Sequence, residues 1–257
     1  MSSRIHPTAI VSSRARLGED VVIGPYSVIA DDVVIGTGSF IGNYVTIDDG
    51  TTIGKNCNIF HNSSIGAPPQ DLKYKGEKTK LEIGDNVVIR ESCTLNRGTV
   101  AHGITKIGNG CLLMAYVHIA HDCQLGENVI FANQATLGGH VVIGEAASLG
   151  GGVLVHQFCR VGRHVFIGGG FRVVQDVPPY ILAAGEPLRY AGINLVGLKR
   201  RGFSAETRTM IKRSYRIYFR SGLQRPAALE KLKSDLPHLP EIEEIVHFIE
   251  TSERSII

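Results

Sequence analysis

The 257-residue chain lacks the features of a membrane or secreted protein. It has no run of about 18 apolar residues, the length that a spanning helix needs, so we expect no membrane span. Its first residues contain no apolar segment of the kind that a signal peptide requires. The formal net charge is only +3, which argues against a protein that coats nucleic acid. The sequence therefore predicts a cytoplasmic protein.

Several motifs of site chemistry are also missing. The five cysteines form no C-x-x-C pair, and their odd number argues against a disulfide framework or a structural zinc site. No G-x-S-x-G stretch marks a strained nucleophilic serine. Tryptophan is absent, whereas glycine occurs 30 times. So much glycine predicts a backbone with many tight turns.

Large aliphatic residues recur at every sixth position from Ile5 to Val173. Of the 29 positions in this register, all but three are Ile, Leu, Val or Phe, the exceptions being Asp71, Glu77 and Ala101. Neither the period of a helix nor that of a strand keeps this register for so long. One large apolar residue in six is typical of the hexapeptide repeat, in which each hexad forms a short strand and a turn.

Small or β-branched residues occupy nearly every position four residues after a large one. Three hexads, about 18 residues, make one coil of a parallel β-helix, and stacked coils bury a shared column of side chains. We therefore expect a mainly β protein with a β-helix over residues 1–190. All the cysteines fall in the small inward register, which predicts buried hydrophobes: Cys57, Cys93, Cys111, Cys123 and Cys159.

Two segments interrupt the hexads. Residues 67–82, "APPQDLKYKGEKTKLE", are polar and should project as a loop from a regular prism. Residues 101–106, "AHGITK", predict a second and shorter excursion. Binding groups usually lie on loops held by a rigid scaffold, so the first loop, with Asp71 and Lys73, is a candidate binding element.

After the repeats the pattern changes. We expect Pro178 and Pro179 to stop the strand ladder and residues 191–257 to form a small helical domain. Its first long helix should have Ser204 as N-cap and stop at Gly222. Two more helices are expected in "PAALEKLKSDL" and "PEIEEIVHFIETS". Nine Lys or Arg and one Glu lie between positions 197 and 225, so this tail is either a solvated basic face or a docking patch for an acidic partner.

Stacking of the coils predicts a site. Residues about 18 apart are neighbours on successive coils, and the run 107–178 is uninterrupted. Position 121 then stacks on 139 and 157, position 122 on 140, and position 120 on 138 and 156. We expect the following residues to gather on one corner at outward positions, where they can face a cleft: His121, Asp122, Gly139, His140, His156 and Gln157.

These residue types fit acyl transfer without a covalent nucleophile. A histidine can take a proton from a hydroxyl, and a neighbouring carboxylate can fix its tautomer and stabilise the imidazolium. A glycine N–H can approach a developing oxyanion closely. Histidines hydrogen-bonded along a surface corner are the alternative interpretation.

Eight short segments carry a family resemblance: "QDLKY", "IRES", "NRGT", "HIAHDC", "GGH", "VHQFC", "QDVPPY" and "GLKRRGF". Over essentially its whole length the chain resembles the UDP-N-acetylglucosamine O-acyltransferases, which belong to the left-handed β-helix acyltransferases. The resemblance implies the left hand of the coils and a homotrimer with clefts between prisms. It also implies transfer of an (R)-3-hydroxyacyl group from acyl carrier protein to the glucosamine 3-hydroxyl of UDP-N-acetylglucosamine, the first step of lipid A biosynthesis.

The resemblance also assigns roles. It implies no metal and no bound cofactor, since the phosphopantetheine of the carrier protein carries the acyl group. It makes His121 the general base, Asp122 its orienting partner and Gly139 the oxyanion donor. The carrier protein would dock on the basic tail. The implied contacts to the sugar nucleotide, the last three to the nucleotide or its phosphates, are Asp71, Lys73, His118, His140, His156, Gln157, Asn194, Arg200 and Arg201.

Specificity is expected to depend on a few positions. Gly169 matches a position that limits acyl-chain length in the family, and glycine there predicts a relatively long chain, although the large Phe171 beside it could shorten or redirect the groove. Asn96 stands where some members carry His, and Val196 where some carry an acidic residue. These departures leave a 3-amino analogue of the sugar open as acceptor.

Other functions compete with this one. A zinc enzyme of the γ-carbonic-anhydrase type shares the β-helix, but the three-residue spacing of His118 and His121 fits its pattern poorly. A non-catalytic solenoid would need neither the charged loop nor the basic tail. The related N-acyltransferase of lipid A synthesis has a domain ahead of the hexads, whereas the hexads here begin at Ile5.

Overall fold

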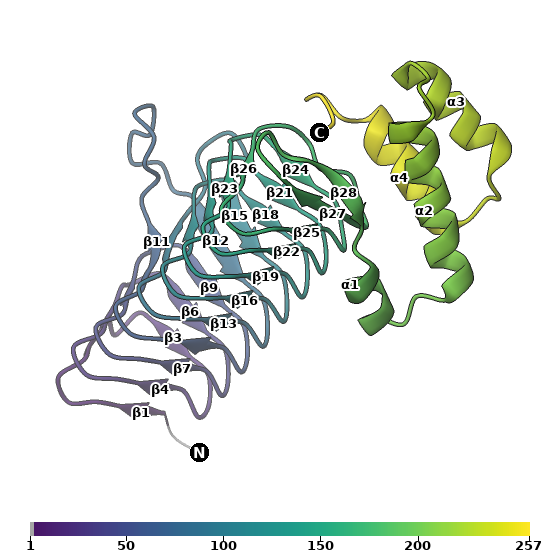
Figure 1. Ribbon diagram of the computed structural model, residues 1–257. Coiled ribbons are helices and arrows are strands. Elements are labelled where there is room, and N and C mark those ends of the chain that lie inside the picture. The colour runs from purple at the N-terminus through teal and green to yellow at the C-terminus, as the bar shows by residue number, and fades with distance from the viewer. Residues whose placement is uncertain (1–2) are drawn as a thin grey trace.

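A computed structural model describes residues 3–257 and has two parts, a long prism of stacked coils and a group of helices at one end of it (Figure 1). Each hexad forms a strand of two to four residues followed by a turn. Strands of successive coils pair in parallel with a register of one coil, as in His118 opposite Thr136. The six-residue period therefore predicted the strands and their stacking correctly.

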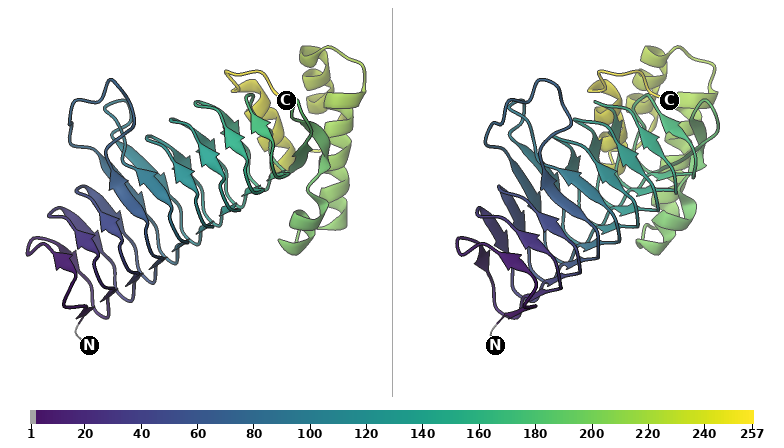
Figure 2. Two further views of the ribbon diagram at one scale, coloured as in Figure 1. Left: turned by 60° about the vertical axis from the view of Figure 1, so that its left-hand side comes forward. Right: turned by 90° about the vertical axis from the view of Figure 1, so that its left-hand side faces the viewer.

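The strands form three faces of the prism (Figure 2). Sheet A contains β1 (Arg4–Ile5), β4 (Val22–Ile23), β7 (Phe40–Ile41), β10 (Asn58–Ile59), β13 (Val88–Ile89), β16 (Leu112–Leu113), β19 (Ile130–Phe131), β22 (Ser148–Leu149), β25 (Phe166–Ile167), β27 (Ile181–Ala184) and β28 (Arg189–Ile193). Sheet B contains β2 (Ile10–Val11), β5 (Val28–Ile29), β8 (Thr46–Ile47), β11 (Ser64–Ala67), β14 (Thr94–Asn96), β17 (His118–Ile119), β20 (Thr136–Leu137), β23 (Leu154–Val155) and β26 (Arg172–Val173). Sheet C contains β3 (Arg16–Leu17), β6 (Val33–Ile35), β9 (Thr51–Ile53), β12 (Lys80–Ile83), β15 (Ile104–Ile107), β18 (Gln124–Leu125), β21 (Val142–Ile143) and β24 (Arg160–Val161).

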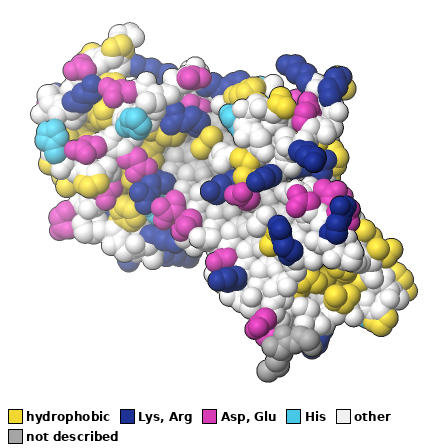
Figure 3. Space-filling view, turned by 180° about the vertical axis from the view of Figure 1, so that it is seen from behind, with side chains coloured by type: hydrophobic (Ala, Val, Ile, Leu, Met, Phe, Trp, Pro, Cys, Tyr) yellow, Lys and Arg dark blue, Asp and Glu magenta, His cyan; other side chains and the backbone are white. Residues whose placement is uncertain are grey.

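The core is the inward column of large and small residues. Burying one Ile or Leu side chain contributes roughly 1.5–3 kcal/mol, and the column repeats this on every face of every inner coil. All five cysteines are buried and reduced, as predicted. Several small inward residues also donate to a backbone carbonyl of a neighbouring coil, for example Ser27 to Gly42 at 2.7 Å and Cys123 to Gly138 at 3.2 Å. Hydrophobic side chains gather outside at the N-terminal end, next to the residues drawn in grey (Figure 3). There the first coil leaves Ile5 45% exposed, because no coil covers it from below.

The corners need left-handed backbone. Tyr116, Asp122 and His140 have φ of 64°, 60° and 61°. Such a conformation costs a non-glycine residue energy unless its surroundings hold it in place. Two of the expected site residues, Asp122 and His140, are thus at positions where the fold itself fixes the backbone.

Both predicted excursions are present. The first connects β11 to β12 and projects from the prism as the loop seen in Figures 1 and 2. The second connects β14 to β15 and is shorter; it spans residues 97–103 and not 101–106, because residues 104–106 belong to β15. Both leave sheet B and return to sheet C, so they rise from the corner that also carries His121 between β17 and β18.

The prediction that Pro178 and Pro179 stop the ladder was wrong. β27 follows them and pairs in parallel with β25, and β28 then adds an antiparallel strand. The prolines lie between Val177, which bridges to Val161, and β27. They therefore occupy a corner, where the ladder needs no N–H from them, rather than a strand.

Four helices follow the last strand: α1 (Leu195–Arg200), α2 (Ala205–Arg220), α3 (Arg225–Asp235) and α4 (Pro240–Glu250). The hydroxyl of Ser204 accepts from the Thr207 N–H at 3.0 Å, and Gly222 has φ of 74°, which confirms the expected cap and stop of α2. The sequence reasoning missed α1. Within residues 3–257 no helix is long and apolar enough to cross a membrane.

Candidate active site

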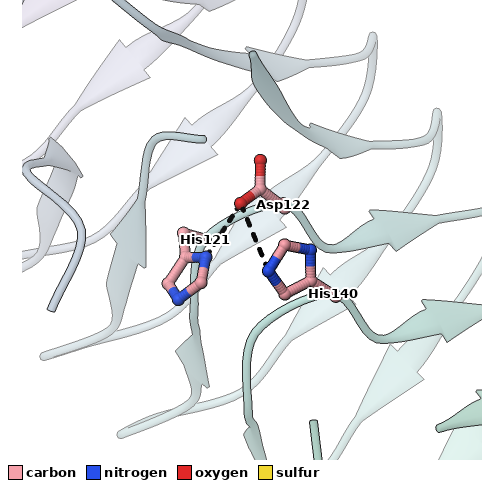
Figure 4. A group of neighbouring side chains, drawn as sticks. All are labelled: His121, Asp122 and His140. Carbon is pink, nitrogen blue, oxygen red and sulfur yellow. Dashed lines mark hydrogen bonds and ion pairs between the residues drawn. The ribbon is translucent and has the colours of Figure 1, made fainter. Parts of the chain in front are cut away.

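A histidine–carboxylate pair lies at the corner between β17 and β18. His121 Nδ1 is 2.9 Å from Asp122 Oδ2 (Figure 4). The His121 side chain is 12% exposed and that of Asp122 is completely buried. The expectation that Asp122 faces a cleft was therefore wrong, because the second excursion covers it. His121 alone of the pair keeps access to solvent.

Thr99, in that excursion, holds the carboxylate. Its hydroxyl donates to Asp122 Oδ2 at 2.6 Å and its N–H donates to Oδ1 at 2.9 Å. The Asp122 N–H donates to the Thr105 hydroxyl at 2.8 Å. Burial opposes ionisation of Asp122, but hydrogen bonds from Thr99 and His121 outweigh it and hold its pKa below the ordinary value. Asp122 is thus a carboxylate at neutral pH, and sequence reasoning missed the threonine that stabilises it.

The carboxylate decides the tautomer of His121. A carboxylate only accepts, so the 2.9 Å contact places the imidazole proton on Nδ1. Nε2 then carries a lone pair and is free to take a proton. This is the arrangement of a general base with an orienting partner.

Gly139 lies directly against the ring of His121. A Cβ at position 139 would come 2.5 Å from His121 Cε1, so no other residue fits without displacing the base. Within residues 3–257 no protein acceptor takes the Gly139 N–H. The preceding carbonyl, of Gly138, accepts from the Cys123 thiol at 3.2 Å. Since C=O and N–H of one peptide point in opposite directions, this bond helps to hold the Gly139 N–H outward.

His140 is the third group at this corner. Its Nε2 lies 3.8 Å from Asp122 Oδ2, and its ring stacks on Phe158 at 4.5 Å. The rings of His121 and His102 meet it edge-on at 5.1 and 5.2 Å. Burial lowers the pKa of His140, so its neutral form dominates near pH 7. Sequence reasoning missed His102; its place in the second excursion was the only available signal.

Ligand atoms of His121, Asp122 and His140 lie within 4.8 Å of one another, which is the spacing of a group able to hold a metal ion. Asp122 Oδ2, however, already accepts from Thr99 and His121. A cation would have to replace the His121 proton in this pair. The hydrogen bonds present favour proton transfer as the chemistry of the cluster.

The other predicted histidines lie nearby on the same side of the prism. His118, on the outer face of β17, has Nδ1 2.7 Å from the Thr94 hydroxyl. Burial first, and then the charge of His121, lower the pKa of His118. His156 and Gln157 are exposed on the next coil, where the Phe158 N–H donates to the Gly139 carbonyl. The stacking of 121, 139 and 157–158 is therefore as predicted.

The projecting loop turns toward this corner. The Asp71 carboxylate accepts from the Lys73 N–H at 2.9 Å, while the Lys73 side chain is exposed. The charge of Asp71 is near enough to His140 to contribute to its pKa. The loop thus brings one carboxylate near the histidine cluster.

Comparison with known proteins agrees with this geometry. Residues 14–49 and 104–139 match the family model of bacterial transferase hexapeptide repeats, and residues 176–257 match that of UDP N-acetylglucosamine O-acyltransferase, domain 2. The acyl-[acyl-carrier-protein]–UDP-N-acetylglucosamine O-acyltransferase of Chlorobaculum tepidum is 59% identical over 95% of this chain and 93% of its own. The chain of the same name from Thiobacillus denitrificans is 50% identical over 98% of both. The crystal structure of the UDP-N-acetylglucosamine acyltransferase of Bacteroides fragilis superposes with a TM-score of 0.97, at 48% identity over 98% of this chain and 99% of that one.

The chain belongs to the UDP-N-acetylglucosamine O-acyltransferase family. The parallel β-helix expected from the hexads is confirmed with it, as are the left hand that the resemblance implied and the C-terminal helical region.

Three residues that the family resemblance assigns to the nucleotide lie away from the pair. The amide of Asn194 is engaged within the chain, because its Oδ1 accepts from the Gly197 N–H at 3.1 Å and its Nδ2 donates to the His164 carbonyl at 2.9 Å. Arg200 and Arg201 are exposed at the end of α1. α1 follows β28 at the end of the prism (Figure 1). His121 lies at the corner between β17 and β18. This chain of the acyltransferase family does not bring them to its own His121.

Gly169, the residue expected to limit acyl-chain length in this acyltransferase, is exposed and lies close to the backbone of the neighbouring coil. A Cβ at Gly169 would lie 3.0 Å from the Gly151 carbonyl oxygen of the coil below. Phe171 is half-buried, and its ring packs over Gly168, where a Cβ would lie 2.9 Å from Cε2. Phe171 thus packs against Gly168, the residue that precedes Gly169.

Proposed function

We propose that the chain transfers an (R)-3-hydroxyacyl group from acyl carrier protein to the glucosamine 3-hydroxyl of UDP-N-acetylglucosamine, the first step of lipid A biosynthesis. The observation that carries this proposal is the free Nε2 of His121 beside the Gly139 N–H, which no acceptor within residues 3–257 takes, in a chain of this family. Base and oxyanion donor lie together, as an acyl transfer to a hydroxyl requires.

The transfer needs no covalent enzyme intermediate. His121 Nε2 removes the proton of the 3-hydroxyl while the oxygen attacks the thioester carbonyl and forms the new C–O bond. The Gly139 N–H donates to the oxyanion, and Asp122 stabilises the imidazolium through Nδ1. Collapse breaks the C–S bond, and the thiolate of the phosphopantetheine takes the proton from His121. The chain needs no cofactor of its own for this sequence.

The rest of the site comes from two copies in this proposal. His118, His140 and the loop residues Asp71 and Lys73 bind the sugar from the copy that supplies His121. The exposed Arg200 and Arg201 meet the phosphates from a neighbouring copy of a homotrimer, as guanidinium groups suit phosphate oxygens. His156, Gln157 and Asn194 complete the contacts. The positions of α1 and His121 at different places along one chain support this division.

Acyl carrier protein docks on α2. Four cationic side chains lie at four-residue spacing on this helix and therefore on one face. They line a groove of about 560 Å³ together with Tyr190, Ile193 and Leu195 of the neighbouring segment. A basic rim with an apolar floor suits an acidic carrier with a largely uncharged pantetheine arm. The cations are Arg208, Lys212, Arg216 and Arg220.

The deciding experiment is a transfer assay on the purified chain. UDP-N-acetylglucosamine and its 3-amino analogue are each offered 3-hydroxyacyl carrier proteins of several lengths, and products are read by mass spectrometry. The proposal, which places the enzyme in the cytoplasm beside both soluble substrates, predicts an ester with a relatively long chain. Product only with the amino sugar would overturn the hydroxyl acceptor, and no product with either would overturn the activity.

A further inference from the structure

Two consecutive residues, Asn96 at the end of β14 and Arg97 directly after it, bind the base of the projecting loop. The Arg97 N–H donates to the Ala67 carbonyl at 3.1 Å, and its guanidinium donates to the Gly66 carbonyl at 3.2 Å. Asn96 Nδ2 donates to the carbonyls of Ala67 and Pro68 at 3.3 and 3.0 Å. Three successive carbonyls, where the chain leaves the prism, are therefore held from the coil above.

Arg97 also reaches the middle of the loop. Its Nε and Nη2 lie 3.2 and 3.1 Å from the Tyr74 hydroxyl, and the guanidinium lies 5.8 Å from the centre of the Tyr74 ring. The Tyr74 hydroxyl in turn donates to the Glu77 carbonyl at 2.7 Å. One side chain thus connects the outgoing base of the loop with its returning limb.

The same short segment continues to the catalytic carboxylate. Thr99, two residues after Arg97, makes the two hydrogen bonds to Asp122. Gly98 between them cannot carry a side chain, because a Cβ there would lie 2.3 Å from the Ile104 nitrogen. The segment is therefore packed closely against the start of β15 and fixes the loop and Asp122 relative to each other.

We propose that Arg97 is a positioning residue that holds the loop in the orientation in which Asp71 and Lys73 bind the sugar nucleotide. This inference rests on the proposed function, because it takes those two residues as acceptor contacts. Arg97 touches no reacting atom. It acts through Tyr74 and through the backbone of residues 66 and 67.

This role needs the planar guanidinium group of arginine, which carries several N–H donors in a fixed arrangement. The guanidinium serves the Tyr74 hydroxyl and the carbonyls of Gly66 and Asp49, the last at 3.4 Å. An ammonium group has no fixed fork and cannot meet these acceptors in one plane. Arg97 also acts on a partly buried carboxyl group: burial raises the pKa of Asp48, and the Arg97 cation opposes that rise.

The test combines kinetics with amide hydrogen exchange on the full-length protein. Arg97→Met and Tyr74→Phe are each expected to raise KM for UDP-N-acetylglucosamine about tenfold, with KM for the acyl carrier protein and kcat within about twofold of wild type. The double variant should have the same KM for UDP-N-acetylglucosamine as Arg97→Met alone, because both substitutions break the same contact between Arg97 and Tyr74. Exchange of the amides in 68–79 should accelerate in both variants.

Arg90→Met is the matched control. Arg90 lies in the same coil but pairs with Glu91 and packs over Phe60 at 4.7 Å, away from the loop. It should leave the kinetics and the loop exchange unchanged. Unchanged loop exchange and sugar-nucleotide KM in Arg97→Met would overturn the inference, as would equal changes in both substrates' KM. Failure of the wild-type chain to bind UDP-N-acetylglucosamine in calorimetry would overturn the proposed function instead, and faster loop exchange in Arg97→Met would still support the anchoring.

Discussion

Thr99 and Asp122 are 23 residues apart in the sequence and are joined by two hydrogen bonds, one from the hydroxyl at 2.6 Å and one from the N–H at 2.9 Å. The excursion that breaks the hexads thereby closes over the carboxylate. Asp122 becomes a buried, fully hydrogen-bonded anion whose remaining partner is His121.

Replacing Thr99 with Val should reduce kcat by about 10- to 100-fold. The substitution keeps the shape but removes a hydrogen bond to a buried charge, worth roughly 1.5–3 kcal/mol. Without it the Asp122 pKa rises, so the acid limb of the kcat–pH profile should move to higher pH, which loss of folded protein would not do. Thr52→Val, on the exposed outer face of β9, is the control and should leave kcat unchanged. A Thr99→Val profile identical to wild type would contradict this role.

A methyl group at Gly139 should abolish transfer while leaving the fold intact. The new Cβ would lie 2.5 Å from the His121 ring and must push the base away from the oxyanion position. We expect Gly139→Ala to lose at least about 100-fold in kcat, the range of a lost oxyanion donor. Gly151→Ala, whose Cβ would meet only the Asn133 oxygen at 3.3 Å, is the control. Circular dichroism should be unchanged in both variants.

Because of His164, the free energy of unfolding of the chain should decrease as the pH falls into the mildly acidic range. It lies between Tyr180 and Phe203, and burial lowers its pKa to about 4, with Arg163 and Arg201 adding to the effect. Because the folded pKa is below that of the unfolded chain, the unfolded state binds the proton first. The stability present above pH 6.5 is then lost progressively down to about pH 4.

Urea unfolding at fixed protomer concentration measures this effect. Between pH 7.5 and pH 5 the His164 contribution should fall by about 2 kcal/mol. His164→Asn tolerates the positive φ of this position and does not titrate, so it should lower stability at pH 7.5 but flatten its decline toward pH 5. An equal decline in both proteins would contradict the assignment.

Gly169 should set the acyl length. A larger side chain there must project from the coil, since the Gly151 carbonyl oxygen would lie 3.0 Å from its Cβ. Gly169→Met is expected to shift the preferred donor to shorter chains with the carrier-protein KM retained. Competition between donors of several lengths, read by product mass, measures the shift. If Phe171→Ser instead lengthens the preferred chain and Gly169→Met does not shorten it, the end of the groove is formed by Phe171.

The sequence was informative wherever one coil repeats the next. The period fixed the inward column, the burial of Cys123 and the stacking of His121 on Gly139, because all of these follow from a constant register. The sequence did not predict the contacts that form where the repeat is interrupted. The burial of Asp122 by Thr99 depends on a contact between an excursion and a later corner, which no local pattern encodes.

The end of the prism was also difficult to predict. Pro178 and Pro179 have the signature of a strand stop, yet they fall at a corner and β27 continues the sheet. α1 is only six residues long and depends on the Asn194 cap, so its helical signal is weak. Asn194 was expected only as a contact to the nucleotide, and its role as the cap of α1 was not anticipated.

The most direct test of the central claim is single-turnover transfer by His121→Ala with both substrates saturating. If Nε2 of His121 is the base, the chemical step should slow by at least about 1000-fold while both substrates bind with wild-type affinity. A single-turnover rate within about tenfold of wild type would contradict the account, because the pair of His121 and Asp122 would then not carry the proton.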